Sequence, residues 1–454
     1  MENNIVVGLD IGTTKIVAVV GERSENGKYR IIGYGHNPSE GVYRGDVINI
    51  KNTAESIKRA VEQARQTSGV DIQEVYVGIA GQHIRTFQLE RTTTRSNPDI
   101  EISTEEIREF TKRQYNTAVK PGEKIIHVLP QFFALDKYSN ILENEIVGMV
   151  GNQLHAAFHV VTANEIALSN IRRAITRAGL TVAGCILEPF ASAESVLDSR
   201  DREVGVVLVD IGGGTTDIAI FNEGILVHTH VIPIAGNMIT HDIKMGCSLE
   251  NNIAEKLKVQ FGSVFADADG DTKIISIPGY KNQSSREISQ ASLAAIIKAR
   301  VQEILECVDF EIKNLNITKP FIGGIVLTGG GSKLTGIISF SEYTTGIDSR
   351  QGYANEHLEE SSFSETLKDP IFATAIGLLI FGIRDEEEKE ESNENKNKPI
   401  KTPGTSTVSD GIPSPVVPDV PKKPIKKPIG FWKNVSDLIT QLTQALDPDE
   451  AKIN

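Results

Sequence analysis

The sequence has few cysteines, no long apolar run and no excess of positive charge. Its 454 residues include only Cys185, Cys247 and Cys307, and this odd, widely spaced set predicts reduced thiols rather than disulfides or a cysteine-bound metal. No apolar run reaches the roughly 20 residues that a membrane-spanning helix needs. The net charge of −13 argues against a nucleic-acid surface, because binding to phosphates draws on an excess of lysine and arginine.

The first residues, Met-Glu-Asn-Asn, lead directly into an apolar strand. They contain neither the basic nor the apolar region of a secretory signal peptide. The apolar fraction of 39% and the charged fraction of 24% are ordinary for globular proteins. We therefore expect a cytoplasmic protein whose length suits two or more domains.

One pattern occurs twice, at domain-sized separation. A β-branched run ends in Asp10 or Asp210, a turn of glycine and threonine follows, and a second apolar run begins. This is typical of a β-hairpin whose tight turn needs glycine. Two such hairpins can face each other across a cleft and offer backbone N–H groups and threonine hydroxyls to phosphates. Asp10 and Asp210 would then lie at the floor of the cleft and could hold a hydrated divalent cation. The alternative is that each Asp only fixes its own turn, which the repetition disfavours.

A third strand runs into a glycine turn at 329–331, and Ser332 follows in a position to cap a helix. Three glycines let a flat ring lie against the backbone without Cβ clashes. Such a turn alone is often only a connection between a strand and a helix. After two phosphate hairpins, it predicts an adenosine-binding turn.

Taken in order, these motifs resemble those of the actin–Hsp70–hexokinase superfamily. The first phosphate motif is similar to 10–15, the first connecting motif to 187–193, the adenosine motif to 329–332 and the second connecting motif to 370–377. Within this superfamily the chain is most similar to the FtsA family of bacterial cell-division proteins.

Four segments carry the likeness to the FtsA family: Ser-Glu-Gly at 39–41 with Arg-Gly-Asp-Val-Ile at 44–48, Val-Gly-Ile-Ala-Gly at 77–81, Pro-Ile-Ala-Gly-Asn-Met-Ile-Thr at 233–240, and the final segment. The likeness covers about 1–384 and returns at 429–446. Ala80 and Ala235 stand where serine and glycine are commoner in the family, and both are changes between small residues.

The alternation of strand and helix patterns with short glycine turns predicts an α/β fold. The resemblance implies an actin-like two-domain fold of ribonuclease H-like subdomains around a nucleotide cleft. Its subdomains would be 1A at 1–82, 163–203 and 361–384, 1C at 83–162, 2A at 204–242 and 316–360, and 2B at 243–315. Apolar residues at helical spacing predict helices at 53–66, 104–118, 164–178, 251–261 and 292–314.

The resemblance implies ATP and Mg²⁺ as cofactors. Asp10 and Asp210 would hold Mg²⁺ through its waters. The nucleotide-binding residues would be Gly12, Thr13, Thr14 and Lys15 on one side of the phosphates, Gly212, Gly213, Gly214 and Thr215 on the other, and Gly236, Glu255, Lys258, Gly330 and Ser332 at the sugar and base. For Glu255 and Lys258 a solvated helix face is the alternative.

Glu188 occupies the first connecting motif and is the candidate catalytic residue, which would orient an attacking water. Its alternative role is to brace the hinge helix. The rate of ATP turnover stays open, and we expect at most slow hydrolysis.

From residue 385 the composition turns acidic and then rich in Asn, Lys, Pro, Ser and Thr, which predicts a flexible linker at 385–428. An amphipathic helix at 429–446 follows. Its apolar residues, with the only tryptophan of the chain, are Phe431, Trp432, Val435, Leu438, Ile439, Leu442 and Leu446. The pattern alone fits a membrane surface or a protein groove equally well, and the resemblance favours the membrane.

The resemblance implies a scaffold at the cytoplasmic face of the cell membrane at the division site. It would polymerise with ATP, bind the C-terminal peptide of the tubulin-like protein FtsZ through 2B, and recruit later division proteins. Arg300 is a candidate contact for that acidic peptide, with a solvated charged face as the alternative.

Three other protein classes share the phosphate hairpins. A sugar or metabolite kinase would need a sugar-binding insertion, an Hsp70-type chaperone would need a β-rich domain after the nucleotide domain, and a pilus-assembly protein would not need the tail. The histidine pairs 155/159 and 228/230 lie in expected strands, so we predict ordinary sheet positions rather than metal ligands.

Overall fold

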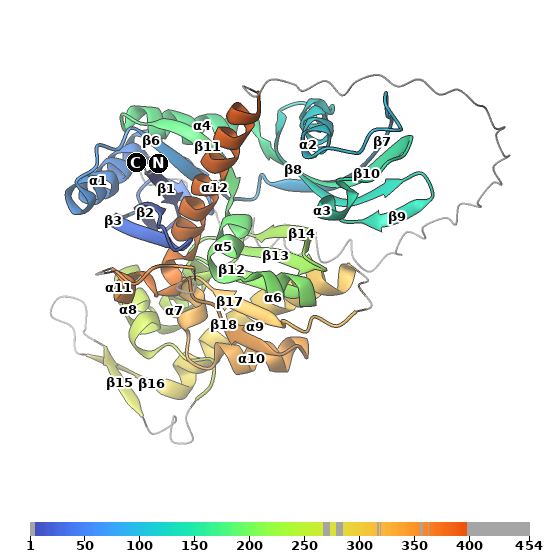
Figure 1. Cartoon of the computed structure of the whole chain (residues 1–454). Helices are drawn as coiled ribbons and strands as arrows, with labels where there is room; N and C mark the ends of the chain where they lie inside the picture. The colour runs from blue at the N-terminus through green and yellow to red at the C-terminus, as the bar shows by residue number, and fades with distance from the viewer. Residues whose placement is uncertain are drawn as a thin grey trace, which may run out of the picture. The chain divides into compact units, whose positions relative to one another are not determined.

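The structure of the protein, a computed structural model, is drawn in Figure 1. It describes residues 5–266, 273–277, 285–315, 317, 319–354, 357–361 and 363–396. Residues 1–397 form one compact unit. The predicted membrane-binding residues at 431–446 lie outside the described residues. In the described part, no helix combines the length and the apolar character needed to cross a membrane.

The first sheet has five strands in the order β11-β6-β1-β2-β3. They are β1 (Val6–Ile11), β2 (Lys15–Arg23), β3 (Tyr29–Pro38), β6 (Glu74–Ile79) and β11 (Thr181–Leu187). β1 and β2 form the first predicted hairpin, with Asp10 opposite Val17. The strands are rich in β-branched residues because both faces of the sheet are buried. Two helices, α1 (Ile50–Ser68) and α4 (Glu165–Arg177), cover one face, and α12 (Ala373–Lys396) covers the other.

The second sheet repeats this plan in the order β14-β13-β12-β17-β18. Its strands are β12 (Val206–Ile211), β13 (Thr216–Asn222), β14 (Ile225–Ile232), β17 (Ile325–Thr328) and β18 (Ser349–Gln351). β12 and β13 form the second predicted hairpin, with Asp210 opposite Asp217. One face packs against α7 (Gly236–Cys247), α8 (Asn251–Phe261), α9 (Gln290–Asn314) and α10 (Ile337–Thr345). Both predicted hairpins are therefore confirmed.

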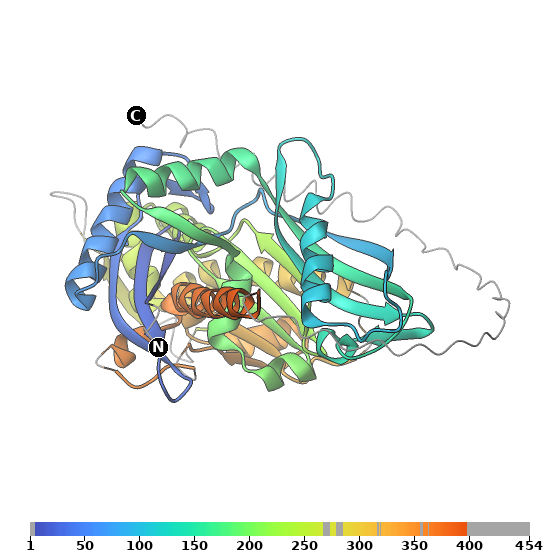
Figure 2. The same ribbon diagram turned by 45° about the horizontal axis from the view of Figure 1, so that its top comes forward.

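The two sheets share one helical layer. α5 (Glu188–Val196) and the start of α12 pack on both of them, and Figure 2 shows the two helices side by side. They cross so closely that a Cβ atom at Gly377 would overlap the carbonyl oxygen of Ala191. Only glycine permits this approach, so the packing of the layer depends on the second connecting motif.

The third sheet is antiparallel, in the order β7-β10-β8-β9. It consists of β7 (Arg85–Thr94), β8 (Glu123–Leu135), β9 (Tyr138–Ile141) and β10 (Gln153–Asn164), with α2 (Thr104–Arg113) and α3 (Glu143–Ile146). These elements have a hydrophobic core of their own. The Gln131 side chain joins the third sheet to the second by donating to the carbonyl of Leu226 at 3.1 Å. The third sheet spans residues 85–164, against 83–162 expected for subdomain 1C.

The remaining elements are short. They are β4 (Val42–Tyr43), β5 (Asp46–Val47), α6 (Ser199–Val204), β15 (Ile274–Ile277), β16 (Arg286–Ser289), α11 (Ser364–Leu367) and the 3₁₀ turns η1 (Gln114–Asn116), η2 (Gly330–Lys333) and η3 (Pro370–Phe372). All five predicted helices are present as α1, α2, α4, α8 and α9. The largest difference is at α2, which ends at Arg113 because the 3₁₀ turn η1 follows it.

The predicted start of the linker is wrong. Residue 385 lies inside α12, which continues to Lys396. The acidic run is not simply solvated, because its charges have partners. The Tyr76 hydroxyl donates to Asp385 at 2.7 Å, and Lys389 lies 2.8 Å from both Asp385 and Glu386. These contacts fasten the acidic turn of α12 to the first sheet.

Candidate functional site

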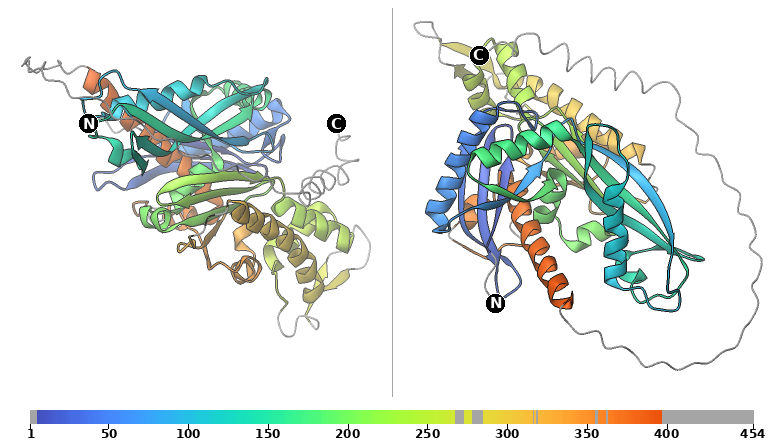
Figure 3. Two further views of the ribbon diagram at one scale, coloured as in Figure 1. Left: turned by 90° about the vertical axis from the view of Figure 1, so that its right-hand side faces the viewer. Right: turned by 90° about the horizontal axis from the view of Figure 1, so that it is seen from above.

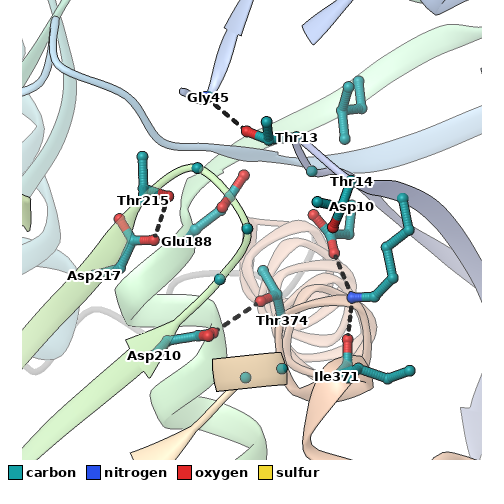
Figure 4. A pocket seen from close by; sticks show the side chains of 18 of the residues that line it. Asp10, Thr13, Thr14, Gly45, Glu188, Asp210, Thr215, Asp217, Ile371 and Thr374 are labelled. Carbon is teal, nitrogen blue, oxygen red and sulfur yellow. Dashed lines mark hydrogen bonds and ion pairs between the residues drawn. The ribbon is translucent and has the colours of Figure 1, made fainter. Parts of the chain in front are cut away.

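A small cavity lies between the two hairpin turns, and Figure 4 shows its lining. Of the predicted site residues, those that line it are Asp10, Gly12, Thr13, Thr14, Lys15, Glu188, Asp210, Gly212, Gly213, Gly214, Thr215 and Gly330. They come from β1, the start of β2, β12, the two turns, the start of α5 and η2. The structure thus brings together the two hairpins, the first connecting motif and the glycine turn at 329–331, which are far apart in the sequence.

The glycine turns approach each other closely. A Cβ atom at Gly213 or Gly214 would run into Thr14 or Thr13 of the opposite turn. The Thr13 hydroxyl also accepts a hydrogen bond from the N–H of Gly45 at 3.1 Å. Glycine is therefore required at Gly213 and Gly214 by the close approach of the opposite turn.

Asp10 and Asp210 lie at the floor of the cavity, 5% and 7% exposed. The Asp210 carboxylate accepts hydrogen bonds from Ser192 at 2.7 Å and Thr374 at 3.1 Å, so it is held by α5 and α12. Lys15 lies 4.0 Å from Asp10 and donates to the carbonyl of Ile371. Burial raises the pKa of Asp10 to about 6, with Lys15 opposing the shift and Asp210 adding to it.

Two further carboxylates complete the group. Asp217 is 4% exposed, and its Oδ2 accepts a hydrogen bond from Thr215 at 2.9 Å. Its Oδ1 is buried and has no hydrogen-bond partner among the described residues. Glu188 lies between the two hairpins in Figure 4. Burial, and then the like charges of Asp10, Asp217 and Asp210, hold the pKa of Glu188 well above its ordinary value. Four carboxylates therefore face one ammonium group, an arrangement that favours an added cation.

The sequence analysis missed Asp217. Burial, and then the charge of Asp210, hold its pKa well above the ordinary value, which marks it as part of the same group. The signal was present in the hairpin itself, because antiparallel register pairs Asp210 with Asp217 across the turn. In the first hairpin the equivalent position is Val17, so the repeat is not symmetric at this point. The two hydroxyl groups that hold Asp210, on Ser192 and Thr374, were also missed.

Four predicted nucleotide-binding residues do not line this cavity: Gly236, Glu255, Lys258 and Ser332. The first three lie next to it in one network. The Gly236 N–H donates to the carbonyl of Gly212 at 3.1 Å, and Lys258 donates to the carbonyl of Gly236 at 3.0 Å. Lys258 also lies 2.8 Å from Glu255, and its side chain is only 13% exposed. This excludes the alternative of a solvated helix face for Lys258.

The expected role of Ser332 as a helix cap is wrong. Ser332 lies inside η2, and its buried hydroxyl donates back to the carbonyl of Gly329 at 2.7 Å. The next helix, α10, is preceded by Gly336 instead. Ser332 therefore stabilises the glycine turn from within.

For Arg300 the structure excludes the alternative of a solvated charged face. Its guanidinium donates to the two carboxylate oxygens of Asp242 at 2.7 and 3.1 Å and also contacts Glu303. The side chain is 14% exposed. Arg300 thus joins α9 to α7, and its charge is already balanced.

Replacing Asp10 by asparagine should stabilise the protein while removing a cleft ligand. A carboxylate whose folded pKa is raised from 3.8 to about 6 costs stability above pH 6 and regains it as the pH falls toward 4. We expect Asp10→Asn to gain up to about 3 kcal/mol at pH 8 and about half of that at pH 5. Thermal or urea unfolding at both pH values measures this.

The matched control is Glu194→Gln. Glu194 is equally buried, but it is paired with Arg202 and Arg384. Its loss should destabilise the protein, because it removes both ion pairs of this buried carboxylate. A fall in stability for Asp10→Asn would contradict the proposed strain at the cleft floor.

Comparisons with known proteins show what the chain is similar to. A family model described as cell division protein FtsA matches residues 207–377, and one described as an SHS2 domain inserted in FtsA matches residues 81–162. Cell division protein FtsA of Pseudomonas aeruginosa is 36% identical over 413 residues, covering 91% of this chain and 95% of that protein. FtsA of Escherichia coli is 33% identical, with 84% and 91% covered, and FtsA of Bacillus subtilis is 32% identical, with 84% of each covered.

Solved structures share the fold at low identity. A PilM–PilN type IV pilus biogenesis complex superposes with a TM-score of 0.61 at 18% identity, covering 83% of this chain and 98% of that one. MreB5 of Spiroplasma citri has a TM-score of 0.51 at 14% identity, with 88% and 100% covered. These likenesses show an actin-like α/β fold. With relatives more than 30% identical over most of its length, the chain belongs to the FtsA family of bacterial cell division proteins.

Proposed function

We propose that this chain binds Mg·ATP between its two hairpins, polymerises, and tethers the FtsZ ring to the cytoplasmic face of the cell membrane. The observation that carries the nucleotide site is the group of four carboxylates between two glycine turns. Among the described residues that line the cavity, Lys15 is the one cationic side chain that opposes them. A related fold, MreB5 of Spiroplasma citri, is described as bound to ADP and to AMPPNP. The proposed binding to the membrane, to FtsZ and to later division proteins is based on the chain's membership of the FtsA family.

The donor set fits Mg²⁺, which prefers oxygen ligands and retains several waters. Asp10, Asp210 and Asp217 would hold it, and the buried Oδ1 atom of Asp217 is free to accept a hydrogen bond from its water. When bound, Mg²⁺ would neutralise phosphate charge. The ion would also lower the raised pKa values of the carboxylates around it.

Other groups of the protein would bind the phosphates and position the attacking water. Backbone N–H groups of the turns at 12–14 and 212–215 would hold the phosphates. Lys15 would exchange the carbonyl of Ile371 for a phosphate oxygen. Glu188, once ionised, would orient a water at the cleft wall, so hydrolysis would be slow unless all of these groups are aligned.

Nucleotide entry requires the two turns to separate. The cavity measures about 60 Å³, whereas ligand pockets occupy roughly 300–1,000 Å³. The turns touch through Thr14 and Gly213. The two sheets are joined by α5 and α12, whose residues Glu188 and Thr374 also line the cavity. Opening about this shared layer would admit the phosphates and move the two halves of a filament subunit.

Asp217→Asn should lower the affinity for Mg·ATP by on the order of 10–100-fold, because the ion's water loses the carboxylate that accepts its hydrogen bond. Asp210→Asn should have a similar effect. Calorimetric titration with ATP, with and without Mg²⁺, measures both. Glu22→Gln is the control, since Glu22 is as buried as Asp217 but pairs with Arg30 outside the cleft. Equal affinities of Asp217→Asn and the parent would overturn the cleft assignment.

The proposed binding of the FtsZ peptide to the α9 region needs a test in which a change in surface charge does not also disturb the fold. Arg300→Asp alone would break the pair with Asp242, so we combine it with Asp242→Arg, which restores the pair in the opposite orientation. If Arg300 contacts the acidic peptide, the double variant should bind about 1–3 kcal/mol more weakly in fluorescence anisotropy. Parental affinity in the double variant would remove Arg300 from the interface.

Membrane attachment is assigned to the apolar residues of 429–446. A chain ending at Lys396 should lose co-sedimentation with liposomes while retaining ATP binding, because α12 stays complete. Trp432→Glu in the full chain should weaken binding through the loss of apolar burial. Since one short helix binds reversibly, attachment should rise steeply with polymerisation. Undiminished pelleting of the shortened chain would refute the role of the tail.

A further inference from the structure

The second sheet carries a cluster of metal-ligating groups that do not line the cleft cavity. His228 and His230 lie two positions apart on β14, opposite Ile220 and Ile218 of β13, so they share the face that packs on α9. Figure 3 shows α9 beneath the strands of this sheet. The helix contributes Glu311 to the same spot. Sequence analysis treated the two histidines as ordinary sheet positions because the third group lies on a distant helix.

The three side chains converge on one point. The Nε2 atom of His228 lies 2.8 Å from Oε2 of Glu311, and the Nε2 atom of His230 lies 3.7 Å from Oε1. The imidazole rings are nearly parallel, with centroids 6.1 Å apart and planes 9° apart. One potential ligand atom from each of the three lies within 4.8 Å of the others.

We propose that His228, His230 and Glu311 bind a divalent transition-metal ion, with Zn²⁺ the ion that their two imidazoles and one carboxylate suit best. Zinc accepts His₂Glu sets with N and O ligands at about 2.0–2.2 Å and leaves a fourth position for water. Tetrahedral bonds of that length separate ligand atoms by about 3.4 Å. The distances from Glu311 to His228 and His230, 2.8 and 3.7 Å, lie on either side of this value. Small side-chain rotations would therefore bring the three ligand atoms to the separation that zinc requires.

The surroundings favour a cation. Along this part of α9, the carboxylates of Glu303, Glu306 and Glu311 lie close enough to Cys307 to add to the burial that raises the pKa of its thiol. The His230 side chain is 44% exposed, so an ion has access from solvent. The side chains of His228 and Glu311 are only 19% and 14% exposed, so the surrounding residues restrict their movement.

The position gives the ion a structural role. β14 is the edge strand of the second sheet. On its other face Thr229 meets His159 of the third sheet at 3.0 Å, and the carbonyl of Leu226 accepts from Gln131. A metal joining β14 to α9 would therefore stiffen the strand on which the third sheet rests.

Cobalt titration of the untagged full chain, with a reductant and excess Mg²⁺, tests the site. Co²⁺ in a tetrahedral site absorbs in the visible range, and Zn²⁺ should displace it. We expect one Co²⁺ per chain, with at least a tenfold loss of affinity in His230→Gln and in Glu311→Gln. His155→Gln is the control, since His155 contacts Thr92 in the third sheet and no residue of the cluster.

A second readout is hydrogen exchange. Zn²⁺ should slow exchange of the β14 amides in the parent and in His155→Gln, and should leave it unchanged in His230→Gln. Absence of Co²⁺ binding, or equal affinity in His230→Gln and the parent, would reduce the cluster to a hydrogen-bonded His228–Glu311 pair. Neither result touches the nucleotide site, which Mg·ATP titration tests independently.

Discussion

The unfavourable burial of like charges at the cleft floor is the constraint on which the rest of this structure depends. Asp10, Asp210, Asp217 and Glu188 lie together, and of the described residues in the cavity lining only Lys15 balances their charge. Such a group costs folding free energy unless a cation or protons compensate it. The fold withstands this cost because the hydrophobic cores that pack on the two sheets supply stabilisation around it. A site strained in this way has a built-in preference for a ligand that brings positive charge.

The same site is fixed mechanically by the layer that the two sheets share. Ser192 of α5 and Thr374 of α12 both donate to Asp210, so the carboxylate of the second hairpin is held by the helices that pack on the first sheet. The close crossing at Gly377 keeps these two helices in register. A change in charge at Asp210 therefore acts directly on the elements that connect the two halves, which is what a nucleotide-dependent conformational change requires.

Much of this could be predicted from local sequence. The hairpins, their aspartates and the glycine turns follow from strand patterns interrupted by residues with few alternatives in tight turns. Residues whose role depends on distant partners could not be found in this way. A solvated charged face stayed open for Arg300 because its partner Asp242 is 58 positions away in sequence. Residue 385 was assigned to the linker because its partner Tyr76 lies far away in sequence, on β6. Composition describes what a segment can do alone, whereas these contacts depend on the assembled fold.

Asp217 shows where the limit lies within a single motif. Its distance from Asp210 in sequence is short, but its importance appears only once the hairpin register sets the two carboxylates opposite each other. The first hairpin has Val17 at that place, beside Lys15 in the same strand. One hairpin thus contributes a carboxylate and an ammonium group, while the other contributes two carboxylates. The repeat conserves the geometry of the turn and divides the charges unequally, so the two halves of the cleft hold different parts of the same ligand.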